Sequence, residues 1–245
     1  MSYRASIIVP VLNESHTIVA SLKHLQVYRE QGCELIVVDG GSDDDTADLA
    51  NPYVDQLIVS AAGRARQMNS GAAAASGLWL LFLHIDTLPP DNPALLLDQL
   101  ERCCNKQSDK EKSIKEHSLK EKDHNKQWCF CQVRLSGSRR VYRMVEWFMN
   151  QRSWLTHIPT GDQLLCFKRD FFTRHNGYAE LPLMEDVEIA KRLRGEYQPQ
   201  RLPVTVVTSS RRWEQHGVIK TVLTMWMLRL LYWLGVSPAH LARWY

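Results

Sequence analysis

Polar residues and glycines follow two apolar runs near the start of the chain. Pro10, Asn13 and Glu14 come at or just after the first run, and Asp39 and Gly41 come at the same place after the second. A carboxylate beside glycine suits a ribose or base edge, because glycine lets a ligand approach the backbone closely. A β-turn that leads into a helix N-cap explains the same residues, and taken alone it is the simpler interpretation.

Two arginines mark a third position of this kind. Arg64 and Arg66 lie in the string Gly63-Arg64-Ala65-Arg66-Gln67-Met68-Asn69, at the start of a predicted helix. Free N–H groups and the helix dipole already favour anions at such a place. The string therefore suits a diphosphate.

A histidine and an aspartate follow a fourth apolar run. His84 and Asp86 are two residues apart and therefore on the same side of an extended chain. An aspartate here can hold Mg²⁺ or Mn²⁺ that also contacts diphosphate oxygens. In isolation, an Asp86 that caps the turn at Thr87 would be a credible alternative.

These positions depend on short apolar runs that alternate with helical patterns. Ile18, Leu22 and Leu25 recur at helical spacing before Gly32, and residues 64–75 are rich in strong helix formers. Strands are predicted at 6–9, 34–38, 57–60, 78–84, 128–135 and 163–167, and further helices at 141–150 and 186–194, after which the chain runs through 204–207 into an apolar C-terminus. Strands separated by helices predict an α/β fold with a mostly parallel sheet, in which ligands bind at the carboxyl ends of the strands.

One segment breaks the pattern. Residues 105–127 contain seven Lys and five acidic residues, and Ile114 and Leu119 are their only large aliphatics. Such a segment cannot bury a core face, so we predict a solvated insertion. Its net charge of 7 − 5 = +2 disfavours a nucleic-acid arm, as does the formal charge of the chain, +3.

The C-terminal segment, residues 218–245, has no acidic residue and carries Trp226, Trp233 and Trp244. Its apolar stretch, 222–236, is shorter than a membrane span and is interrupted by Arg229. Two alternatives remain: an amphipathic helix at a membrane surface, or a helix packed on the domain as ordinary core.

The N-terminal residues 1–10 lack the apolar stretch of a secretory signal, which predicts a cytoplasmic protein, with peripheral contact to the inner face of the membrane as an option. The six cysteines should then be reduced packing residues, because none has zinc spacing. They are Cys33, Cys103, Cys104, Cys129, Cys131 and Cys166.

Taken together, the motifs resemble those of the family 2 inverting glycosyltransferases with the GT-A fold. The resemblance rests on Pro10-x-x-Asn13-Glu14, Asp39-Gly40-Gly41-Ser42-x-Asp44-x-Thr46, Gly63 to Asn69, His84-x-Asp86, Gly161-Asp162-Gln163 and Glu185-Asp186. It implies a single Rossmann-like GT-A domain over residues 1–217 with the insertion 105–127, followed by a C-terminal helical segment at 218–245. The string Gly63 to Asn69 and the tail Arg211-Arg212-Trp213-Glu214-x-His216-Gly217 look like a bacterial subgroup sometimes associated with arsenosugar biosynthesis.

The resemblance also implies a role for each position. Transfer would run from a UDP- or GDP-sugar to an unknown acceptor hydroxyl, with Asp186 as general base, Glu185 beside it, and Mn²⁺ or Mg²⁺ on Asp86 with His216 as a further candidate ligand. Nucleotide-sugar binding would fall to Pro10, Asn13, Glu14, Asp39, Gly41, Arg64, Arg66, Asn69, His84 and Asp86, and acceptor binding to Gly161, Asp162, Gln163, Arg212 and Trp213. A helix start whose acidic residues only complement the dipole is the alternative for Glu185 and Asp186.

Two departures from the family pattern affect this assignment. His84 stands where the first residue of an Asp-x-Asp is usual, and Arg212-Trp213 lacks the preceding Gln of a Gln-x-x-Arg-Trp. Trp213 could stack on an acceptor sugar or be a packing residue, and a lone His such as His216 is more often structural.

Two other functions compete with sugar transfer. A nucleotidyltransferase shares a related fold, but it typically has a Gly-rich loop with Arg and Lys near the first strand, where this chain has Pro10 to Glu14. A degenerate nucleotide-sugar-binding protein gains support from His84 and loses it from the intact Glu185-Asp186.

Overall fold

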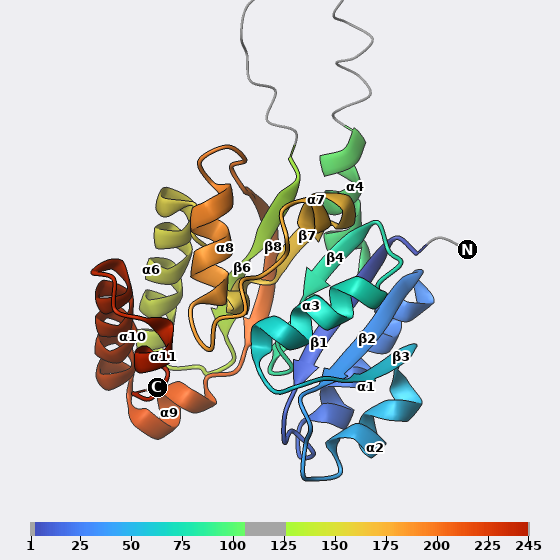
Figure 1. Cartoon of the computed structure of the whole chain (residues 1–245), viewed down its shortest axis with the longest axis horizontal. Coiled ribbons are helices and arrows are strands. Elements are labelled where there is room, and N and C mark those ends of the chain that lie inside the picture. Colours follow the sequence, from blue (N-terminus) through green and yellow to red (C-terminus); the bar gives the residue numbers. More distant parts are fainter. Residues whose placement is uncertain (1–2, 106–125, 245) are drawn as a thin grey trace, which may run out of the picture.

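The computed structural model describes residues 3–105 and 126–244, which form one sheet of eight strands with helices on both faces (Figure 1). The strands are β1 (Ala5–Val11), β2 (Cys33–Asp39), β3 (Gln56–Val59), β4 (Trp79–Phe82), β5 (Thr87–Leu88), β6 (Trp128–Leu135), β7 (Leu165–Lys168) and β8 (Gln200–Thr208). Their order across the sheet is β3-β2-β1-β4-β7-β6-β8-β5. This arrangement confirms the predicted α/β class with a mostly parallel sheet.

The first four strands of that order are all parallel, as predicted from the alternation of apolar runs and helices. Helices α1 (Ile18–Glu30), α2 (Thr46–Ala50) and α3 (Arg64–Ala74) connect them, together with a short 3-10 turn, η1 (Asn51–Tyr53). The carboxyl ends of β1, β2 and β4 therefore meet at one edge of the sheet, where the sequence predicts the chemistry.

The second half of the sheet changes direction. Strand β7 pairs antiparallel with both β4 and β6, β6 pairs parallel with β8, and the short β5 pairs antiparallel with β8. Its other elements are α4 (Ala94–Asn105), α6 (Arg140–Thr156), the 3-10 turn η2 (Gly161–Gln163), α7 (Arg169–Arg174) and α8 (Glu185–Leu193). Because β7 runs backwards, the residues that precede it lie at the same edge as the residues that follow β4.

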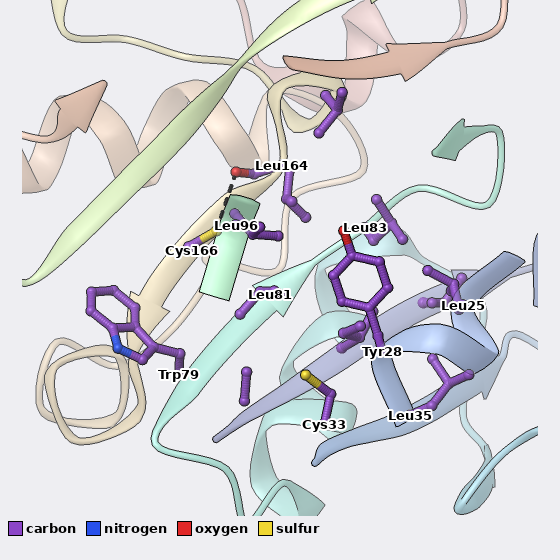
Figure 2. Close-up of a cluster of buried hydrophobic side chains, with 14 of the residues drawn as sticks. Leu25, Tyr28, Cys33, Leu35, Trp79, Leu81, Leu83, Leu96, Leu164 and Cys166 are labelled. Atoms are coloured by element: carbon purple, nitrogen blue, oxygen red, sulfur yellow. Dashed lines mark hydrogen bonds between the residues drawn. The ribbon is translucent and has the colours of Figure 1, made fainter. Parts of the chain in front are cut away.

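The core has two layers, one on each face of the sheet. Along β1, Ile7 and Val9 point into the layer covered by α1 and α4, whereas Ile8 points into the layer covered by α3, α7 and α8. This alternation follows from the two-residue period of a strand. Figure 2 shows the first layer, where Tyr28 and Leu25 of α1 lie over Leu35 and Leu81.

Some local predictions differ from the structure. The predicted strand 78–84 ends at Phe82, because the chain turns at Ile85 and Asp86, where the N–H of Thr87 donates to the carbonyl of His84 at 3.0 Å. The helix α4 was not predicted. Of the predicted charged insertion, residues 106–125 lie outside the described residues. The five cysteines with described side chains are all buried and none forms a disulfide, in agreement with the predicted packing role.

The C-terminal segment forms α9 (Arg211–His216), α10 (Val218–Trp233) and α11 (Pro238–Leu241). One face of α10 packs against α6, where Val222 and Met225 join Tyr142 and Val145 in a small apolar cluster. The opposite face of α10 remains exposed. Within the described residues, no helix combines the length and apolarity needed to cross a membrane.

Candidate active site

A cleft of about 530 Å³ opens where the two halves of the sheet meet at the carboxyl edge of β1 and β4. Both halves contribute to its walls, and α10 closes one side. Many of the residues predicted from the sequence line it: Pro10, Glu14, Arg64, His84, Asp86, Gly161, Asp162, Glu185, Asp186, Arg212 and Trp213. The cleft thus brings together side chains that the sequence places far apart.

The antiparallel pairing of β4 with β7 explains how His84 meets η2. Phe82 pairs with Leu165, so the residues just after β4 lie opposite the residues just before β7. His84 Nδ1 lies 3.3 Å from Asp162 Oδ1. A Cβ atom on Gly161 would lie 2.4 Å from the His84 ring, closer than real Cβ contacts allow. The absence of a side chain at Gly161 is what lets the imidazole reach Asp162.

Asp162 is ionised in this setting. Burial by itself would raise the pKa of its carboxyl, but the hydrogen bond with His84 and the charges of His84, Arg64 and Arg212 together lower the pKa. Burial lowers the pKa of Arg212, and the charge of Asp162 opposes that effect. The floor of the cleft therefore carries paired charges.

Asp186 is held by backbone groups from two elements. Its Oδ2 accepts the N–H of Gly161 at 3.0 Å, and its Oδ1 accepts the N–H of Val187 at 2.7 Å. Burial and the adjacent Glu185 raise the pKa of Asp186 from 3.8 to about 6, against the lowering effect of these two hydrogen bonds and of Arg64. A carboxylate whose pKa lies near the operating pH is suited to accept a proton.

Glu185 and Arg64 connect the first turns of two helices across the cleft. Glu185 is buried at the start of α8, and Arg64 Nη1 lies 3.4 Å from its Oε1. Arg64 opens α3 directly after Gly63, whose φ of 134° is one that L side chains rarely adopt. The start of α3 thus presents a half-exposed guanidinium together with free N–H groups, which fits the predicted anion site.

Asp86 is the candidate ligand for a hard cation such as Mg²⁺. Among the described residues, no group of three or more His, Cys, Asp or Glu side chains is arranged to hold a metal. Mg²⁺ is commonly bound through one or two carboxylates, with substrate phosphates and water completing its coordination. One carboxylate from Asp86, facing the same cleft as the predicted anion site at the start of α3, would match that mode of binding.

Several predicted nucleotide residues build the loops behind the cleft. Asp39 accepts the N–H groups of Gly41 and Ser42 at 3.0 and 2.9 Å, and Ser42 Oγ also donates to it. Asn13 Oδ1 accepts the N–H of Asp43 at 2.9 Å. These bonds tie the loop after β1 to the loop after β2, and Asp39, Gly41 and Asn13 are outside the cleft lining.

Four other predicted site residues also lie outside that lining. Arg66 forms an exposed ion pair with Glu180 at 2.9 Å, and Asn69 exchanges hydrogen bonds with the backbone of Tyr178. Gln163 is fully buried, and its Oε1 accepts from Ser153 Oγ at 2.5 Å. His216 is exposed at the end of α9. The structure therefore does not bring His216 into the cleft beside Asp86.

Trp213 sits at the predicted acceptor side, yet only 7 % of its surface is exposed. It packs in the cluster that joins α6 to α10 and still contributes to the cleft wall. Packing therefore accounts for most of its surface.

Sequence reasoning missed Gln67 and Arg152. Gln67 Nε2 donates to the carbonyls of Val11 and Val38 at 2.7 and 2.8 Å, which joins the ends of β1 and β2 beneath the cleft. Burial lowers the pKa of Arg152, whereas the charges of Asp186 and Asp162 raise it. Gln67 lies inside the Gly63 to Asn69 string, so the motif could have indicated it. No local signal marks Arg152, because it is one polar position of a long helix.

Comparison with known proteins agrees with this geometry. Residues 6–109 match the model of Glycosyl transferase family 2. The family 2 match thus covers the parallel half of the sheet, with the loops after β1, β2 and β4 and the start of α3. Over 88 residues the chain is 39 % identical to PGL/p-HBAD biosynthesis glycosyltransferases of Mycobacterium bovis and Mycobacterium tuberculosis. That alignment covers 33 % of this chain and 34 % of each relative. The chain is therefore similar to glycosyltransferases over part of its length, and the family match lies in its first half.

Solved structures extend the likeness to most of the fold. A mannosyltransferase from Pyrobaculum calidifontis, in complex with GDP-Man and Mn²⁺, aligns with a TM-score of 0.57 at 21 % identity, covering 84 % of this chain and 57 % of that one. A mannosyl-3-phosphoglycerate synthase from Rubrobacter xylanophilus aligns with a TM-score of 0.55 at 16 % identity, covering 95 % of this chain and 75 % of that one. At these identities the likeness concerns the fold, and it confirms the predicted GT-A type.

Proposed function

We propose that this protein is a metal-assisted, inverting glycosyltransferase that moves a sugar from a UDP- or GDP-sugar to an acceptor hydroxyl. The observation that carries the proposal is that one cleft holds both Asp186 and Arg64, the first with a raised pKa and the second at a helix start. The family 2 match over residues 6–109 supports the same reaction.

The residues divide the reaction between a donor side and an acceptor side. Arg64 and the N–H groups of α3 would bind the diphosphate, and Asp86 would be the protein ligand of Mn²⁺ or Mg²⁺. When bound, the metal stabilises negative charge on the diphosphate. The neighbour from Pyrobaculum calidifontis is described with GDP-Man and Mn²⁺, which supports Mn²⁺ and a GDP-sugar as first choices.

On the acceptor side, the hydroxyl oxygen of the acceptor forms a bond to the anomeric carbon. Asp186 takes the proton of that hydroxyl in the same step. The bond from that carbon to the diphosphate breaks on the opposite face, so configuration is inverted. The hydrogen bonds from Gly161 and Val187 fix the direction of the carboxylate, and the His84–Asp162 contact fixes the loop that supplies one of them.

The first test is product analysis with a panel of donors and acceptors, including a precursor of arsenosugars because of the subgroup resemblance. We expect release of nucleoside diphosphate together with the glycosylated acceptor. Release of pyrophosphate would instead indicate a nucleotidyltransferase, and donor binding without turnover would indicate a binding protein.

The pH dependence of transfer should have an acidic limb. Asp186 can accept a proton only when it is deprotonated, and its pKa is raised to about 6. We therefore expect kcat/KM to fall about tenfold per pH unit below that value and to be level above it. Steady-state kinetics over a pH range in which circular dichroism shows no unfolding would measure this. A limb near pH 4, the ordinary range of an aspartate, would contradict the assignment.

Gly161→Ala should impair transfer without unfolding the protein. The added methyl group collides with the His84 ring, which must move and shift the Asp162 loop. Misplacement of about 1 Å in an active site can cost 10²-fold, so we expect kcat to fall roughly 10- to 100-fold. Gly195→Ala is the matched control, because a Cβ atom there meets nothing within 4 Å. Equal activity of both variants would show that the His84 position is unimportant.

A further inference from the structure

The exposed face of α10 is a continuous apolar stripe. Ile219, Leu223, Trp226, Leu230 and Trp233 follow one another at spacings of three and four residues, which places them on one side of the helix. They are between 56 and 78 % exposed, although each is large and apolar. Since the opposite side of α10 packs on the domain, this helix is apolar on both faces.

Helix α6 carries a second stripe beside the first. Met144, Trp147, Phe148, Trp154 and Leu155 also recur at helical spacing and are between 51 and 70 % exposed. Figure 1 shows α6 and α10 side by side, and their buried faces share one apolar cluster. We call the two stripes together the α6–α10 face.

Helices α6 and α10 themselves expose cations and no carboxylate. Residues 215–245 contain no acidic residue, and residues 136–161 contain only Glu146, which is buried and accepts the N–H of Leu135 at 2.6 Å. Exposed cations are present in the same segments: Arg139, Arg140, Lys220 and Arg243. Tryptophans among aliphatic side chains, with cations and without exposed carboxylates, form the composition that favours the interface of an anionic bilayer.

We propose that the α6–α10 face binds the surface of an anionic lipid bilayer, with its aromatic and aliphatic side chains inserted at the boundary between headgroups and acyl chains. A second copy of the chain fits less well, because a twofold interface on this face would bring its cations together with no exposed carboxylate on either helix to pair with them.

The contact would also orient the cleft. Met149 of α6 and Met225, Leu228 and Arg229 of α10 line the cleft from the side of the same two helices. If the proposed transferase function holds, an acceptor with an apolar part could then pass from the bilayer surface into the cleft. Membrane binding itself does not depend on that function.

Vesicle co-sedimentation of the full chain tests the proposal. We expect binding to vesicles of phosphatidylcholine mixed with phosphatidylglycerol, weaker binding to phosphatidylcholine alone, and weaker binding at high salt. The combined variant Trp147→Ser, Trp226→Ser and Trp233→Ser should lower the partition coefficient at least about tenfold, since a tenfold change corresponds to only ~1.4 kcal/mol.

The matched control is Val59→Ser combined with Leu78→Ser, because these side chains are 70 and 53 % exposed but belong to β3 and to the loop before β4. It should bind like wild type, and thermal melts should show that both variants fold.

Wild-type protein that stays in the supernatant, or equal binding by the tryptophan variant, would overturn the proposal. So would light scattering that shows a wild-type dimer and a monomeric tryptophan variant. Nucleoside diphosphate release with soluble substrates is measured separately, so failure of the transferase function would be distinguishable.

Discussion

Replacing Asp186 by Asn is expected to lower kcat by roughly 10²-fold or more, the usual scale for the loss of a general base. Asn keeps the shape of the side chain but cannot take the proton of an acceptor hydroxyl. Donor affinity should change little, because the diphosphate is assigned to Arg64, the start of α3 and Asp86 rather than to Asp186. Initial rates with a verified acceptor, together with calorimetric donor binding, measure the two effects independently.

Two opposing effects should leave the stability of the variant near that of wild type. Both carboxylate oxygens of Asp186 accept backbone N–H groups, from Gly161 and Val187, and the amide of Asn offers only one acceptor, so one hydrogen bond is lost. Asn also removes a buried charge that burial and Glu185 disfavour, so we expect the free energy of unfolding at neutral pH to change by no more than about 1 kcal/mol. Chemical denaturation would show it, and kinetics should be measured well below the melting temperature.

Glu188→Gln is the control on the same helix. Glu188 pairs with Arg192 at 2.7 Å and is outside the cleft lining, so removal of its charge should leave kcat near wild type. If Asp186→Asn also transferred sugar at a near-wild-type rate, Asp186 would be only a structural residue at the start of α8. The search for the base would then move to Glu185 or Asp162.

The parallel half of the sheet could be predicted because its signals are local. Apolar runs, helical spacing and the residues that follow each strand locate β1, β2 and β4 and the start of α3, and the cleft lies where their carboxyl ends meet. Such signals do not give the direction of a later strand. The antiparallel course of β7 depends on how the connections fold, and it is this course that places Asp162 against His84.

Residue type alone does not tell which carboxylate faces the cleft. Asp39 and Asp86 both follow strands, but Asp39 is occupied by the backbone of its own loop, whereas Asp86 faces the cleft. The difference arises from the φ of 85° at Gly41, which directs the chain back over Asp39. The sequence also left open whether one face of α10 is exposed, because an apolar helix has the same residue pattern whether that face is covered or not.

Asp86→Ala should abolish the effect of metal on nucleotide binding. In wild-type protein we expect Mn²⁺ to tighten UDP or GDP binding at least about tenfold relative to EDTA, because a cation between carboxylate and diphosphate supplies several kcal/mol of charge stabilisation. The described residues contain no group of three or more His, Cys, Asp or Glu side chains that could hold the metal in place of Asp86, so binding with Mn²⁺ and with EDTA should become nearly equal in the variant. Isothermal titration calorimetry measures this without any acceptor.

His84→Ala separates a metal ligand from a positioning residue. Because His84 Nδ1 faces Asp162 at 3.3 Å, its loss should weaken the effect of Mn²⁺ less than the loss of Asp86 does, while still lowering transfer through the displaced Asp162 loop. Asp91→Ala, at a carboxylate that is 98 % exposed and outside the cleft lining, controls for the loss of one negative charge from the same part of the chain. Metal dependence that is the same in wild type and in Asp86→Ala would remove Asp86 from the site. Loss of that dependence in His84→Ala alone would make the imidazole the ligand in its place.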